Sequence, residues 1–334
     1  MKYAPVCIVT LNRYDHFKKC LESLEKCNGA NETEVFVALD YPPSEKYIAG
    51  WKQIDSYLLD KERNCFFRKL NVIRRKHNCG VGKPCGNWEL LLEYIQEHYD
   101  RYIFTEDDNV FSPNFLDFVN MGLGKFENDA FVSAVIGYCH PYPFKTCDNN
   151  FFFHRSDFSA WGYGTWTAKQ NKIIEEIRGG CLKKTFSCKN YLKVRKHGYN
   201  RLLSYLSIVL ISPKKYIWIT DSVLTVYNIV NDKCVVVPVM SKVRNEGWDL
   251  SGCSIVQRNA DKFFAKYGQV AARHNEQVID SDITFEYKGM GHNFFEYNDK
   301  VAVQFSDGRI SYLSFIGKVI VLVLKFIVKR IIRK

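Results

Sequence analysis

The sequence lacks the short motifs that mark the commonest metal and nucleotide sites. It has 12 cysteines, but no CxxC pair and no Cys/His spacing of the kind that binds zinc. It has neither the Walker pattern of a P-loop nor the GxGxxG pattern of a dinucleotide-binding turn. It also has no internal repeat and no low-complexity linker. A zinc module, a P-loop enzyme and a repeat protein are therefore all disfavoured.

No signal-peptide pattern is present at the N-terminus, where Met1-Lys2-Tyr3 leads directly into a strand-like run. Unpatterned cysteines without such a signal are typical of reduced thiols, and most of them are expected to be small core residues. We therefore expect a cytoplasmic protein.

Acidic residues are absent after Asp307, whereas seven lysines and arginines follow it. Much of the net charge of +11 is thus a terminal feature. The 24 Phe and 20 Tyr residues do not interleave with basic residues on one stretch, so no nucleic acid partner is expected. A non-catalytic basic adaptor for a membrane or nucleic acid remains the alternative from a different functional class.

One acidic stretch, Tyr102 to Phe111, organises the chain. Tyr102, Ile103 and Phe104 are typical of a short buried strand, and Glu106-Asp107-Asp108 follows where that strand should end. Ser112-Pro113 is then expected to begin a helix, with Ser112 as its N-cap. Three adjacent carboxylates repel one another unless a cation joins them, and hard oxygens suit Mn²⁺ or Mg²⁺. The stretch predicts a metal site for a nucleotide diphosphate, with a solvated acidic turn as the alternative.

Strand-like and helix-like segments alternate through the first half, which predicts a mostly parallel sheet with helices on both faces. Ligands bind beyond the carboxyl ends of such strands. Arg13, Asp40 and the acidic triplet all follow strand ends, and their convergence favours the nucleotide site over the acidic turn. The expected strands are 4–10, 33–39, 70–74, 102–104, 131–136 and 235–239, and the expected helices begin near Asp15, Ser44, Trp88 and Thr167.

Other segments offer weaker signals. The loop Gly80-Val-Gly82 with Lys83 is able to approach a phosphate, but it also fits a plain loop. Ser159 to Trp166 places aromatics among glycines, which suits stacking on a sugar or a packed turn. Asn245 to Gly252 is a polar, glycine-rich loop that is placed to cover a site.

Five segments in order resemble GT-A fold glycosyltransferases over roughly residues 3 to 255. The resemblance is greatest to bacterial sugar transferases related to the N-acetylglucosaminyltransferase I type that acts on N-glycans. It implies an α/β fold with a Rossmann-like, mostly parallel sheet flanked by helices. The segments are Thr10-Leu-Asn-Arg13, Leu39-Asp40, Asn78 to Gly82, Glu106-Asp-Asp108 with Ser112-Pro-Asn-Phe115, and Ala160-Trp-Gly-Tyr-Gly-Thr-Trp166.

The resemblance implies transfer of a sugar from a nucleotide diphosphate sugar donor, with a divalent metal on the diphosphate. Asp108 would then bind the metal as part of a DXD-type motif, and Glu106 and Asp107 would hold the ribose and the donor sugar. Asp40 would contact the base or ribose, and Arg13 would line the nucleotide pocket. A hexosyltransferase of this kind usually inverts the anomeric centre.

An inverting enzyme needs a carboxylate that takes a proton from the acceptor hydroxyl. Asp221 is the expected catalytic base, with Asp157 and Asp249 as rivals. The chain departs from the related pattern at Cys253-Ser254, where a histidine is expected after the glycine. A metal-dependent nucleotidyl or phosphoryl transferase is a further alternative, although a second acidic motif and a phosphate signature are lacking.

The chain is expected to form one domain over residues 1–300, with a nucleotide half of about 1–125 and an acceptor half of about 126–300. Residues 311–334 form a separate tail. In it, Lys318, Lys325, Lys329 and Arg333 share one helical face and the rest is apolar. This pattern predicts an amphipathic helix on the anionic inner face of the membrane. The alternatives are a terminal helix docked on the protein and, less favoured, a tilted span with snorkelling lysines. Membrane contact suits a glycan or lipid-linked acceptor in surface polysaccharide assembly.

Overall fold

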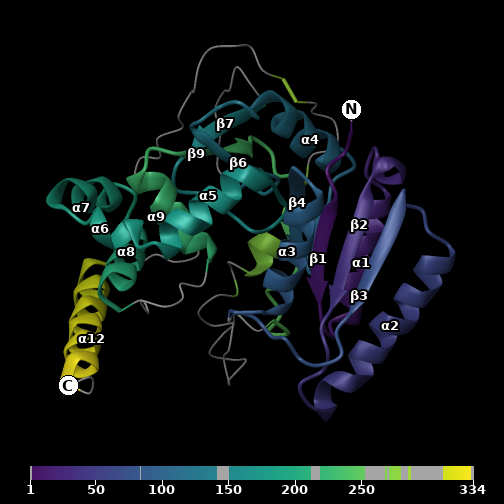
Figure 1. The fold of residues 1–334 in the computed structure, drawn as a ribbon, viewed down its shortest axis with the longest axis horizontal. Coiled ribbons are helices and arrows are strands. Elements are labelled where there is room, and N and C mark those ends of the chain that lie inside the picture. The colour runs from purple at the N-terminus through teal and green to yellow at the C-terminus, as the bar shows by residue number, and fades with distance from the viewer. Residues whose placement is uncertain are drawn as a thin grey trace.

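The structure is a computed structural model that describes residues 2–82, 84–140, 150–211, 219–252, 268, 271–279, 285–286 and 311–331. Its centre is an eight-stranded sheet in the order β3-β2-β1-β4-β8-β6-β9-β7 (Figure 1). A separate pair, β5 and β10, forms a second small sheet. The α/β class and the large sheet flanked by helices are as expected from the sequence.

The first half of the chain supplies the parallel part of the sheet. β1, β2, β3 and β4 pair in parallel because a helical crossover joins each strand to the next. Right-handed crossovers place α1 and α2 on one face and α3 on the other. Phe36 of β2 accordingly contacts Tyr94 of α3, whereas Phe17 of α1 contacts Tyr57 of α2. The elements are β1 Val6–Thr10, α1 Tyr14–Glu25, η1 Ala30–Glu32, β2 Glu34–Leu39, η2 Glu45–Tyr47, α2 Ile48–Arg63, β3 Lys69–Arg74, α3 Asn87–His98 and β4 Arg101–Glu106.

The second half makes the sheet mixed. β8 runs antiparallel between β4 and β6, and β7 runs antiparallel to β9 at the edge. The short β5 pairs with β10 just beyond the end of β4. The elements are β5 Asn109–Phe111, α4 Phe115–Lys125, β6 Val132–Ile136, β7 Phe151–His154, β8 Tyr163–Trp166, β9 Cys234–Pro238 and β10 Val243–Asn245.

The remaining helices gather at the end of the molecule away from β3 (Figure 1). The C-terminal helix α12 packs on α8 there, so the predicted tail helix is present. The helices are α5 Thr167–Arg178, α6 Cys181–Lys184, α7 Cys188–Arg195, α8 Tyr199–Ile211, α9 Asp221–Val230 and α12 Tyr312–Ile331. None of the helices in the described part of the chain combines the length and apolar composition needed to cross a bilayer.

Some expected element ends were wrong. Glu106 is the last residue of β4 rather than part of the following loop. Asp15 lies in the first turn of α1, whose N-cap is Arg13. The N-cap of α4 is Asn114 rather than Ser112, whose hydroxyl donates to the Asn114 side chain. Each of these ends lies two residues from the expected position, which is the usual variation of element boundaries.

Helix α4 approaches β8 closely because Gly164 has no side chain. A Cβ built on Gly164 would lie 2.5 Å from Val119 Cγ1 and 2.9 Å from Leu123 Cδ1, both on α4. Trp166 Nε1 donates to the Leu123 carbonyl at 3.2 Å and fixes the same contact. This packing joins the helix that follows the acidic stretch to the centre of the sheet.

We expect Gly164→Ala to lower the free energy of unfolding by about 1–3 kcal/mol, because the methyl group overpacks the contact with α4. Gly124→Ala is the matched control, since nothing lies within 4 Å of its built Cβ and it lies on a helix. That control should be neutral or stabilise by up to about 1 kcal/mol. Urea unfolding measures both, and equal effects would contradict the close approach.

Candidate active site

The carboxyl ends of β1 and β4 bring the predicted acidic stretch beside the loop after β1. Val9 pairs with Glu106 and Thr10 pairs with Leu39, so the ends of three parallel strands lie level. Thr10 Oγ1 donates to Asp107 Oδ2 at 2.7 Å and ties the two loops together. The sheet register therefore fixes the position of Asp107 before any ligand is considered.

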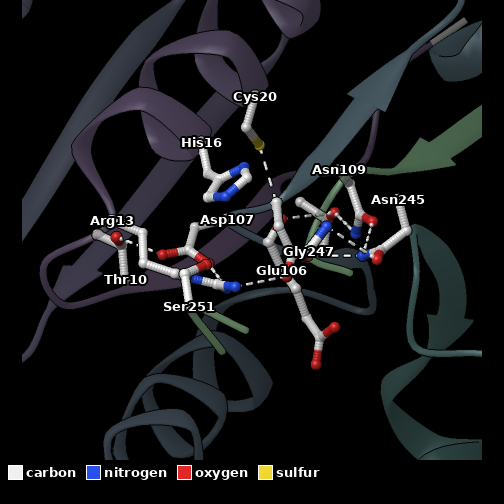
Figure 2. A network of polar contacts seen from close by, with 12 residues as sticks. Thr10, Arg13, His16, Cys20, Glu106, Asp107, Asn109, Asn245, Gly247 and Ser251 are labelled. Atoms are coloured by element: carbon white, nitrogen blue, oxygen red, sulfur yellow. Dashed lines mark hydrogen bonds and ion pairs between the residues drawn. The ribbon is translucent and has the colours of Figure 1, made fainter. Parts of the chain in front are cut away.

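Arg13 is the cation that the buried carboxylates face. Its Nη1 donates to Asp108 Oδ2 at 2.8 Å, and its Nη2 pairs with Asp107 Oδ1 (Figure 2). The side chains of Asp107 and Asp108 are 7% and 9% exposed. Burial alone would lower the pKa of Arg13, but the charges of the two carboxylates raise it by more. Arg13 thus joins Asp107 and Asp108 in one charged cluster, as expected from their positions in the sequence.

A second loop supports Asp108 from the far side. Asn245, the last residue of β10, donates through Nδ2 to Asp108 Oδ1 at 2.7 Å and to Asn109 Oδ1 at 2.9 Å. The backbone N–H of Glu246 donates to the Asp108 carbonyl at 2.8 Å, and that of Gly247 donates to Asn245 Oδ1 at 3.2 Å. The Asp108 carboxylate is therefore held in place by a residue more than 130 positions away in the sequence.

Glu106 is half-buried, and the ion pairs of Arg13 are with the other two carboxylates of the triplet. Figure 2 shows its side chain directed away from the Arg13 pair. Burial, followed by the charges of Asp108 and Asp221, raises the pKa of Glu106 to about 8, although Arg13 acts in the opposite direction. Burial also raises the pKa of Asp107, against the opposing charge of Arg13. Carboxylates held against repulsion in this way are candidates for ligand contact.

Asp221 lies near enough to Glu106 for its charge to affect the titration of that residue. It is the first residue of α9, and its Oδ2 accepts a hydrogen bond from the Ala160 N–H at 3.1 Å. Burial raises the pKa of Asp221 to about 6, against the opposing influence of the Ala160 N–H and of Arg201. The structure thus brings Asp221 to the same rim as the acidic triplet, although the sequence separates them by more than a hundred residues.

Asp40 is placed differently from the other predicted residues. Its Oδ1 accepts hydrogen bonds from the N–H groups of Tyr41 at 2.9 Å and Cys79 at 2.8 Å. Its Oδ2 accepts from Asn78 Nδ2 at 3.2 Å and from the Gly80 N–H at 2.8 Å. Asp40 therefore holds the loop after β3, and its predicted contact with a base or ribose stays a prediction.

The two rival base candidates have other partners. Asp249 Oδ2 pairs with His16 Nε2 at 2.8 Å, and its Oδ1 accepts from the Ser251 hydroxyl at 2.6 Å. Burial raises the pKa of Asp249, but Ser251 and His16 lower it by more. Asp157 lies 3.6 Å from His154 Nδ1. The unexpected Cys253-Ser254 pair and Lys83 of the glycine loop lie outside the described residues.

Within the described part of the chain, no group of three or more His, Cys, Asp and Glu side chains is arranged to hold a metal ion. The donor chemistry nevertheless fits a hard cation, because Mg²⁺ and related ions often take one or two carboxylates and complete their shell with phosphate and water. Gly247 packs directly against the carboxylate, since a Cβ there would lie 2.1 Å from Asp108 Oδ2. A small cation at Asp108 would share its carboxylate with Arg13.

Several residues of this site were missed by the sequence reasoning. Asn245 and Gly247 were seen only as part of a covering loop, and Thr10 only as part of a motif. The Asn-Glu-Gly sequence after a short apolar run was the available signal. It did not reveal which acidic residue the loop would contact, because that depends on the pairing of β10 with β5.

No known protein-family model matches the chain, and no curated protein matches it. Similar solved structures include S. aureus TarS, with 17% identity over 52% of this chain and 30% of that chain at a TM-score of 0.34. S. aureus TarS 1-349 is 14% identical, covers 85% of this chain and 67% of its own, and has a TM-score of 0.39. The mannosyltransferase PcManGT from Pyrobaculum calidifontis, solved in complex with GDP-Man and Mn²⁺, is 12% identical. The match covers 72% of this chain and 57% of that chain, with a TM-score of 0.34.

The chain thus spans 30% of the first TarS chain and 57% of the PcManGT chain. At these identities and TM-scores the similarity assigns no activity to the chain.

We expect Glu106→Gln to stabilise the protein at alkaline pH in the presence of a chelator. Because the folded pKa of Glu106, about 8, lies above its unfolded value, the folded state binds more protons and the wild type loses stability as pH rises between those values. The variant should gain at least ~1 kcal/mol at pH 8–9 and nothing below about pH 4. Unfolding midpoints across pH measure the difference.

The matched control is Glu22→Gln, at a half-buried residue whose Oε1 lies 3.9 Å from Lys18 Nζ. Its effect should be small and should not grow between pH 5 and 9. A gain for Glu106→Gln that is the same at all pH values would contradict the raised pKa.

Proposed function

We propose that the chain is a metal-dependent, inverting glycosyltransferase of the hexosyltransferase class. It moves a sugar from a nucleotide diphosphate sugar to a hydroxyl of a glycan or lipid-linked acceptor. The observation that carries the proposal is the buried cluster of Arg13, Asp107 and Asp108 at the ends of β1 and β4, with Glu106 and Asp221 on the same rim. Such strand ends are the ligand-binding edge of an α/β sheet.

The charge balance of the cluster supports a divalent cation bound together with the donor. One guanidinium faces two buried carboxylates, and the charges of Asp108 and Asp221 disfavour ionisation of Glu106. Asp108 would hold Mn²⁺ or Mg²⁺ through the carboxylate that it shares with Arg13. When bound, such an ion supplies Lewis-acid stabilisation of the charge on the departing diphosphate.

The remaining carboxylates suit sugar hydroxyls. Glu106, directed away from the Arg13 pair, is placed to accept hydrogen bonds from a ribose or donor-sugar hydroxyl (Figure 2). Asp107 is held rigid by Thr10 and Arg13, so it offers a fixed acceptor rather than a mobile one. Arg13 would line the nucleotide side of this pocket and keep the carboxylates ordered before the donor binds.

Asp221 is the proposed catalytic base. A general base works best when its pKa is near the operating pH, and burial brings that of Asp221 to about 6. Asp249 is less suited, because Ser251 and His16 lower its pKa. The Ala160 N–H holds one oxygen of Asp221 in place for proton transfer from the acceptor hydroxyl.

The acceptor side is proposed to use the aromatic segment that follows Ala160. Trp161 is half-buried, and its ring lies edge-to-face with Tyr138 at 4.7 Å between centroids. It follows directly after the residue that holds Asp221, so a sugar packed on it would lie near the proposed base. Aromatic rings at this position support a glycan acceptor, in keeping with surface polysaccharide assembly.

A donor screen tests the binding half of the proposal. Thermal unfolding is measured with Mn²⁺ alone and with a panel of nucleotide sugars with and without Mn²⁺. One donor should raise the midpoint by mass action, and only with Mn²⁺. Asp108→Ala should lose both the Mn²⁺ effect and the donor effect. No shift with any donor, or a full shift in Asp108→Ala, would contradict the proposal.

The catalytic half is tested by separating binding from turnover. Asp221→Asn should keep the donor-induced shift of the midpoint but lower kcat by at least about 10²-fold, because it removes the proton acceptor. Asp249→Asn is the control, and its kcat should change little. A large loss in Asp249→Asn with normal turnover in Asp221→Asn would assign the base to Asp249 instead.

A further inference from the structure

Helix α12 is held in a fixed orientation on the helical end of the molecule. Phe315 and Leu322 of α12 are buried against this end, and Tyr199 of α8 contacts Phe315 at 4.8 Å and Tyr312 at 5.7 Å between ring centroids. The guanidinium of Arg195 on α7 lies over the Tyr199 ring, 3.8 Å from its centroid. One narrow side of α12 is thus docked, and its other sides have a defined direction.

The opposite side of α12 is a broad exposed apolar face. Its residues recur three and four positions apart, so they form one continuous stripe. Leu313 is 81% exposed, and Ile320 and Leu324 are each 55% exposed. A contiguous patch of this kind on a folded protein marks an interaction surface. The face comprises Leu313, Ile316, Ile320, Val321, Val323, Leu324, Ile327 and Val328.

The chemistry that borders this apolar face is cationic. Helix α12 contains no acidic residue, and exposed Lys318 and Lys325 lie seven positions apart on its flank. Both lysines also line a groove of about 470 Å³ between α12 and α8, together with Leu203, Val321 and Leu322. An amphipathic molecule with a negative head and an apolar tail matches both the flank and the groove.

We propose that this face of α12 docks on an anionic lipid bilayer, with the apolar stripe in the interfacial region and Lys318 and Lys325 at the headgroups. Such helices combine apolar burial with attraction of lysine to anionic lipid. A second copy of this chain fits less well, since two α12 faces would bring lysines together with no acid on either helix to pair with them.

Co-sedimentation of the full chain with vesicles tests the docking. Vesicles of phosphatidylcholine alone are compared with vesicles that also contain about 30 mol% of phosphatidylglycerol. We expect binding to the anionic vesicles, weakening as salt rises. Leu324→Asp, and separately Lys318→Glu with Lys325→Glu, should each lower the partition coefficient at least about tenfold. Both act on exposed side chains, so circular dichroism and the unfolding midpoint should be unchanged.

The matched control is Leu59→Asp. Leu59 is 45% exposed on α2, at the other end of the molecule from α12 (Figure 1). This variant should bind the anionic vesicles as the wild type does. Equal binding by Leu324→Asp would overturn the proposal, as would equal binding to both vesicle types. Absence of vesicle binding would also overturn it, and light scattering that showed a dimer dissociated by Leu324→Asp would assign the face to a second copy.

Discussion

The ion pairs of Arg13 with Asp107 and Asp108 are the interaction on which the rest of the site depends. Buried charges are costly unless they are paired and hydrogen-bonded. Thr10 and Asn245 supply hydrogen bonds that complete the two carboxylates from opposite sides. The cluster therefore links the loop after β1, the end of β4 and the end of β10, and loss of Arg13 would leave two buried carboxylates without their cation.

Three acidic groups on the same rim have different electrostatic surroundings. Asp108 pairs directly with Arg13. Burial and the neighbouring charges raise the pKa of Glu106 to about 8, and burial raises the pKa of Asp221 to about 6. Such a rim is able to hold a cation at one point and accept a proton at another.

Helix α8 lies between α12 and the helix that carries Asp221, α9. It carries Arg201, whose charge acts against the raised pKa of Asp221, and it also packs against α12. A surface bound through α12 would thus lie at a fixed orientation to the side of the sheet where the proposed base is found. This arrangement would suit an acceptor presented from a membrane, and it makes α8 the structural link between the two proposals.

The sequence by itself determined the strand-helix alternation, the position of the acidic triplet after a buried strand and the presence of a C-terminal amphipathic helix, because each depends on periodicity within one segment. The tertiary structure alone decided that β8 runs antiparallel, that Asn245 and Gly247 support Asp108, and that Asp40 holds the loop after β3. These features depend on which distant segments pair, and local patterning carries no information about the partner.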